Sequence, residues 1–186
     1  MPGPNQARQQ AVQAELRAVG AELGRHDEAI AMFQKAAALQ ETPEASRGIA
    51  LVGVIQAMSA KGDYDGVIDY YNRHSDTLPP GNVRPKMLLL VGHAYRMRKS
   101  YARAVEVYLI VEQYHKDTDE AFEAGYWKLY CFYLLNDKDL GEFANGFIAR
   151  YTPTKGDHEF LILARLIRAD FFFNKDRKST RLNSSH

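Results

Sequence analysis

The chain has 186 residues, a length that allows one or two compact domains or a row of stacked helical repeats. Its 24 basic and 23 acidic residues give a formal charge of +1, and they are mixed along the chain, so no basic stripe indicates nucleic-acid binding. The single cysteine, Cys131, excludes an intrachain disulfide and a multi-cysteine zinc site.

No run of about 18 apolar residues predicts a membrane span, and the polar start shows no charged segment followed by an apolar one, as a signal peptide would. The sequence leaves the compartment open between the cytoplasm and a bacterial envelope.

Apolar periodicity predicts helices throughout. We expect nine, near residues 8–24, 27–40, 44–61, 64–77, 85–98, 101–116, 119–136, 139–151 and 157–174. No turn dipeptide separates alternating apolar runs, so we expect no strands. The prolines are expected only near repeat boundaries or the N-terminus, outside helix interiors. They are Pro2, Pro4, Pro43, Pro79, Pro80, Pro85 and Pro153.

The helices repeat with a regular spacing. Gly24, Gly62, Lys99 and Asp137 follow one another at intervals of 38, 37 and 38 residues. A small residue and an aromatic residue recur four positions apart in each of the first three copies: Ala29 and Phe33, Val67 and Tyr71, Ala104 and Tyr108. Such a pair lies on one helix face, where the small residue admits a neighbouring helix and the aromatic ring fills the remaining space.

This pattern resembles the tetratricopeptide repeat family. The residues that carry the resemblance are Gly24, Ala29, Phe33, Gly62, Tyr64, Tyr71, Gly92, Tyr95, Tyr101, Ala104 and Tyr108. It implies an all-α fold, a right-handed α-solenoid of antiparallel helical hairpins, with repeats at about 10–43, 48–81, 85–118 and 122–153 and a truncated fifth from 157. The period of 37 to 38 exceeds the family's 34, and such long, tyrosine-rich repeats look like bacterial outer-membrane assembly lipoproteins.

The end of the chain carries two further expectations. Phe160, Ala164, Ile167 and Phe171 mark the apolar face of the last helix, which we expect to lie partly bare without a following helix. Residues 176–186 resemble a translated sequencing adapter, so we set them apart as a non-native or disordered tail. The natural protein is then expected to continue beyond Lys175.

The resemblance also implies a partner-binding groove lined by the first helix of each repeat. The residues expected to face it are Lys86, Leu89, His93, Arg96, Trp127 and Cys131. The cations would pair with a carboxylate of a bound peptide, and Trp127 would give apolar contact. In the alternative interpretation Trp127 is core packing and the cations are a solvated face.

Chemistry other than binding finds little support. Cys131 has no base nearby in sequence, and His115, Asp117 and Asp119, like Asp137 and Asp139, fit helix caps better than metal ligands. No phosphate-binding loop is present, and we expect no cofactor. We therefore expect a non-catalytic scaffold for a protein or peptide ligand. The alternatives are a docking or regulatory region of a longer enzyme or signalling protein, or a bacterial envelope assembly or secretion component.

Overall fold

The chain is all-α in the part that the structure describes. The computed structural model describes residues 25–79 and 81–183, with the backbone alone at 176 and 178–183. These ranges contain eight α-helices, one short 3₁₀ helix and no strand, which confirms the predicted fold class at this level. The predicted helix 8–24 and Gly24 lie outside the described residues. The chain divides into two compact units, residues 1–98 and 99–186, and the division falls inside the predicted repeat 85–118.

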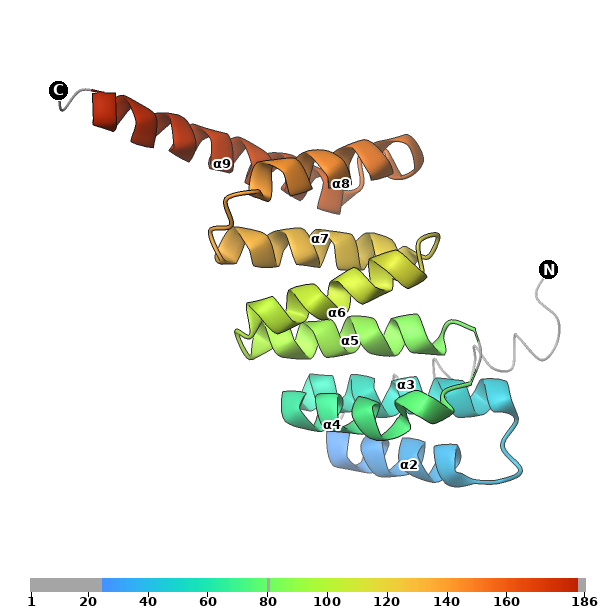
Figure 1. Ribbon diagram of the computed structural model, residues 1–186. Coiled ribbons are helices and arrows are strands. Elements are labelled where there is room, and N and C mark those ends of the chain that lie inside the picture. Colours follow the sequence, from blue (N-terminus) through green and yellow to red (C-terminus); the bar gives the residue numbers. More distant parts are fainter. Residues whose placement is uncertain (1–24, 80, 184–186) are drawn as a thin grey trace. The chain divides into compact units, whose positions relative to one another are not determined.

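The first unit is built from helices that reverse direction from one to the next (Figure 1). They are α2 (His26–Ala38), α3 (Glu44–Lys61), α4 (Tyr64–His74), the 3₁₀ helix η1 (Ser75–Thr77) and α5 (Val83–Met97). Helix α3 lies at the centre of this unit, because it packs against α2, α4 and α5. It is accordingly the helix with the most buried residues in the unit.

The contact between α2 and α3 depends on a small residue opposite a large one. Phe33 of α2 is buried and lies against Gly53 of α3, where an added Cβ would come within 2.5 Å of the Phe33 ring. The backbone of α3 therefore reaches the ring directly, and burial of an aromatic side chain of this size contributes about 1.5–3 kcal/mol. In α4 the sequence prediction was off by one residue, since Tyr70 is buried and Tyr71 only half-buried.

The turns between hairpin helices use left-handed backbone at evenly spaced positions. Gly62, Lys99 and Asn136 have φ of 81°, 59° and 52°, so the interval is 37 residues in both cases. After Gly62, the amide of Asp63 donates to the Met58 carbonyl, and the Asp63 carboxylate then accepts from the Gly66 amide to begin α4. The sequence prediction placed the fourth position of this series at Asp137, one residue too late.

The second unit has an unusually aromatic core. Its helices are α6 (Tyr101–Tyr114), α7 (Asp119–Leu134), α8 (Leu140–Lys155) and α9 (Glu159–Asn183). Helix α7 packs against the other three, so it is the central element here as α3 is in the first unit (Figure 1). Phe122 of α7 stacks on Phe147 of α8 with ring centroids 5.6 Å apart. At one end, Lys155 and Asp119 join α8 to α7 through an ion pair of 2.6 Å.

Helix α8 is longer than the sequence predicts, because it continues through a proline. Pro153 lies inside α8, near its C-terminal end, whereas we expected the helix to end at about residue 151. A proline there removes one helical hydrogen bond. On either side of it, Thr152 donates through Oγ1 to the Ile148 carbonyl at 2.6 Å and Thr154 donates to the Tyr151 carbonyl at 3.3 Å.

Helix α9 is apolar on more than one side, and the prediction of its bare face was wrong. Ala164 and Ile167 are buried in the core of the second unit, and Phe160 and Phe171 pack against that core. The exposed apolar side chains belong to other positions, among them Leu166 and Phe173, each 61% exposed. The helix also runs to Asn183, so it includes the first residues of the segment 176–186.

Candidate functional site

The six residues predicted from sequence to bind a partner lie on two helices that belong to different units. Lys86, Leu89, His93 and Arg96 are on α5, and Trp127 and Cys131 are on α7. Each group is therefore described by itself.

On α5 the predicted residues differ in exposure. Lys86 is exposed, His93 and Arg96 are half-buried, and Leu89 is buried among the apolar residues of the helix. Leu89 thus serves packing, and Lys86 is the one member of this group whose side chain lies open to solvent.

On α7 both predicted residues take part in packing. Trp127 is half-buried, lies 5.0 Å from the Tyr126 ring and 6.0 Å from the Phe160 ring, and donates from its indole nitrogen to Glu123 at 3.1 Å. Cys131 is fully buried and is not part of a disulfide. The position of Trp127 agrees with the alternative interpretation, in which it belongs to the core, and Cys131 packs as a small buried side chain.

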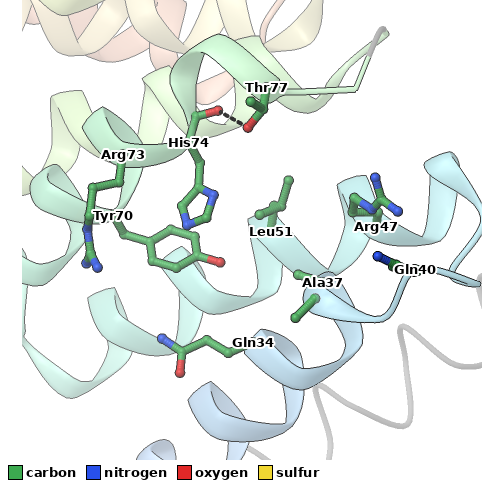
Figure 2. A pocket seen from close by; sticks show the side chains of 10 residues that line it. Gln34, Ala37, Gln40, Arg47, Leu51, Tyr70, Arg73, His74 and Thr77 are labelled. Atoms are coloured by element: carbon green, nitrogen blue, oxygen red, sulfur yellow. Dashed lines mark hydrogen bonds between the residues drawn. The ribbon is translucent and has the colours of Figure 1, made fainter.

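The first unit contains a pocket that the sequence analysis did not predict. It has a volume of about 460 Å³ and is bordered by the ends of α2 and α4, the beginning of α3 and η1 (Figure 2). The residues that line it are Gln34, Ala37, Ala38, Gln40, Arg47, Leu51, Tyr70, Arg73, His74 and Thr77. A pocket of this size accepts a side chain or a small molecule.

Local sequence explains how the walls of this pocket form. Helix α2 ends after Ala38, and the Thr42 hydroxyl caps it by donating to the Ala36 carbonyl at 2.9 Å. Pro43 then occupies the N-cap of α3, and Arg47 reaches the pocket from the first turn of the new helix. On the opposite side Thr77 donates to the His74 carbonyl at 3.2 Å and holds the tight turn that follows α4 (Figure 2).

The wall from α4 is a stack of an aromatic ring and an imidazole. The rings of Tyr70 and His74 lie 4.4 Å apart between centroids, and Arg73 sits at the rim, 5.9 Å from the Tyr70 ring (Figure 2). Burial lowers the pKa of His74, with a smaller contribution from Arg73, so the imidazole is largely neutral at pH 7. Burial also raises the pKa of Tyr70, so its hydroxyl stays protonated and can donate.

Arg47 forms the other side of the pocket and is incompletely paired. Its Nε is buried and has no hydrogen-bond partner. A cation near the end of a helix, such as Arg73, is favoured by the helix dipole, but Arg47 lies near the start of α3, where the dipole disfavours a cation. The dipole therefore does not account for the position of Arg47, whose Nε is enclosed beside the pocket without a partner.

A smaller hollow of about 270 Å³ lies in the second unit beside an ion pair that is shielded from water. Glu112 of α6 and Lys128 of α7 line it and pair with each other, with side chains 10% and 18% exposed. The Tyr151 hydroxyl, which also borders this hollow, is buried without a hydrogen-bond partner, and burial raises the pKa of Tyr151. This site is more enclosed and more evenly charged than the pocket of the first unit.

No protein-family model, no curated protein and no solved structure matches this chain. Within residues 25–79 and 81–183, no three His, Cys, Asp or Glu side chains come together as a metal site would require. Over the same described part of the chain, none of the helices combines the length and the apolar character needed to traverse a bilayer. The pocket of the first unit is therefore the best-defined candidate site.

Sequence reasoning missed this pocket for a physical reason. Its residues come from three helices, the turn between α2 and α3, and a 3₁₀ turn, spread from Gln34 to Thr77, and none belongs to a motif. The one available signal was that Arg73 and His74 follow Tyr70 by three and four positions, which puts a cation, an imidazole and an aromatic ring together on the last turn of α4.

Proposed function

We propose that this protein is a non-catalytic helical-repeat scaffold, similar to tetratricopeptide proteins, that binds a segment of a partner protein. The proposed repeat is a helical hairpin of 37 residues, and the even spacing of Gly62, Lys99 and Asn136 supports it. Stacking of such hairpins into a right-handed solenoid would give a surface that is larger than a compact domain of the same length offers.

The observation that carries this proposal is the open pocket on the first unit. Three helices converge there around a space for one side chain, and Arg47 offers a buried donor that no described residue satisfies. Unsatisfied buried donors are rare in folded proteins and are expected where a ligand completes the hydrogen bonding. A pocket with such a donor on a helical scaffold fits the anchoring of a partner's side chain.

The test is selection of peptides from a random dodecapeptide library on the full chain. We expect enriched peptides with Kd below about 100 µM, a range typical of single-segment recognition. A photoreactive residue at Ala38, on the rim of the pocket, should crosslink to them. The same residue at Lys138, which is exposed in the second unit, is the control and should not.

Two results would overturn the proposal. One is that no peptide is enriched above an unrelated helical protein. The other is that the selected peptides crosslink equally through Ala38 and Lys138, because the pocket would then have no special part in binding.

A further inference from the structure

The pocket of the first unit has an uneven charge. Arg47 and Arg73 line it from α3 and α4, and no Asp or Glu is among its lining residues. The whole chain, by contrast, is nearly balanced, with 24 basic and 23 acidic residues. A concave site with cations alone attracts an anion, because low-polarity walls concentrate the field of the charges.

The donors of the pocket suit an oxygen acceptor. The buried Arg47 Nε has no partner, and the Tyr70 hydroxyl points into the space between α2 and α3 (Figure 2). Gln34 of α2 adds an amide on the remaining side. A carboxylate has two oxygens and accepts several hydrogen bonds at once, and bonds from a guanidinium to a carboxylate are among the stronger ones in proteins.

The remaining walls of the pocket are apolar, and they limit which kind of molecule can bear the anionic group. Ala37, Leu51 and the Tyr70 ring form these walls, and Leu51 and Tyr70 are each only 4% exposed. Methylene groups would be well placed against them, whereas a free inorganic ion would leave them without contact. The volume of about 460 Å³ accepts a short aliphatic stem that ends in a charged group.

We propose that this pocket binds the carboxylate of a glutamate or aspartate side chain of a partner protein. The carboxylate would pair with Arg47 and accept from Tyr70, while the stem lies against Leu51. This proposal rests on the proposed scaffold function, since it takes the carboxylate to be presented by a bound segment.

The probe is N-acetyl-glutamate N-methylamide, titrated into the isotope-labelled full chain and followed by NMR. We expect shifts of the Gln34 and Arg47 side-chain signals, with the glutamine analogue binding at least about tenfold more weakly because it lacks the charge. Inorganic phosphate is the second comparison. Tighter binding of phosphate than of the glutamate probe, or equal binding of the glutamine analogue, would overturn the carboxylate assignment.

Variants assign the binding to the pocket. Arg47→Met should weaken binding of the glutamate probe by about tenfold to a hundredfold, the loss expected for one charged hydrogen bond. Arg103→Met, which removes an exposed cation paired with Glu106 on α6, is the matched control and should leave binding unchanged. Equal binding by Arg47→Met and the original chain would refute the assignment.

A second variant keeps the test valid if Arg47→Met fails to fold. Ala38→Glu changes an exposed residue at the end of α2 and places a fixed carboxylate at the rim of the pocket. It should also reduce binding of the probe at least about tenfold, through repulsion and competition for the same cations. Unchanged binding in a folded Ala38→Glu chain would contradict the proposal.

The outcomes separate this inference from the scaffold proposal. If selected peptides crosslink through Ala38 but the glutamate probe does not bind, the scaffold stands and the carboxylate assignment fails. If the probe binds at Arg47 but no peptide is selected, the pocket is an anion site and the scaffold proposal fails.

Discussion

The shielded ion pair between Glu112 and Lys128 should be a strong determinant of the stability of the second unit. Lys128→Met removes the ammonium group and keeps most of the side-chain volume. The Glu112 carboxylate, whose side chain is only 10% exposed, then stays in a site with little water and without its partner. An uncompensated charge in such surroundings destabilises the folded state.

Two estimates of the stability lost in Lys128→Met give a similar magnitude. Removal of one member of a buried ion pair costs about 3–5 kcal/mol. Coulomb attraction between unit charges about 4 Å apart is about 4 kcal/mol at an effective dielectric constant of about 20. Since a folded domain is stable by about 5–15 kcal/mol, the variant should lose a large part of the stability of this unit. With a urea slope of about 1 kcal/mol per molar, the midpoint should fall by about 3–5 M.

The assay is urea unfolding followed by tryptophan fluorescence. Trp127 is the only tryptophan of the chain and precedes Lys128 in α7, so its emission reports the second unit. Lys138→Met, which removes an ammonium group whose side chain is 90% exposed, is the control and should shift the midpoint little.

The double variant Glu112→Leu with Lys128→Met decides the mechanism. It removes both charges, so stability should return to near the original value or rise above it by about 1–4 kcal/mol. The reasoning is refuted if Lys128→Met costs no more than Lys138→Met, or if the double variant is as unstable as Lys128→Met alone.

Three further changes test other features. Gly53→Ala places a Cβ within 2.5 Å of the Phe33 ring and should lower the free energy of unfolding, measured by thermal unfolding, by about 1–3 kcal/mol. Adding Phe33→Leu to the same chain should recover part of this loss. If the effects of the two single variants simply add in the double variant, the two residues are not coupled and the contact is contradicted. Lys99→Gly relieves a left-handed backbone at φ 59° and should raise stability by up to about 1 kcal/mol after the entropy cost of glycine, so a lower melting temperature would count against it. The hydrogen bond from Lys155 lowers the pKa of Asp119, so this carboxylate stabilises the fold above about pH 4, and the gain is lost as pH falls through its lower folded-state pKa. The pair is exposed and worth less than about 1 kcal/mol. The melting temperature of the original chain should therefore be slightly higher than that of Asp119→Asn at pH 7 and equal to it near pH 2.5. A difference in melting temperature that persists in acid would contradict this account.

The sequence was sufficient to predict the helices, because their signals are local. Apolar residues at helical spacing located all eight described helices, and Gly62 marked a left-handed helix end. The errors also have local causes. Asn136 takes the left-handed backbone in place of Asp137, since asparagine tolerates it well. Pro153 lies in the last turn of α8, where it removes a single helical hydrogen bond and the helix continues to Lys155.

The site was harder to predict, because it depends on which helix faces turn toward one another. Helix α9 shows the difficulty, since its apolar residues lie on several sides and the sequence does not indicate which side meets α7 and α8. Arg47 poses the same problem, because nothing near it in sequence shows that its Nε becomes buried without a partner. Both facts follow from contacts between distant segments, which periodicity does not encode.

The contact of Phe33 with Gly53 restricts the order in which mutations can accumulate in this protein over generations. A larger residue at position 53 meets the ring at once, whereas a smaller residue at position 33 leaves a void that a methyl group at 53 could later occupy. Substitution of a smaller residue at position 33 first is therefore the easier route, and the two positions should covary among homologous sequences.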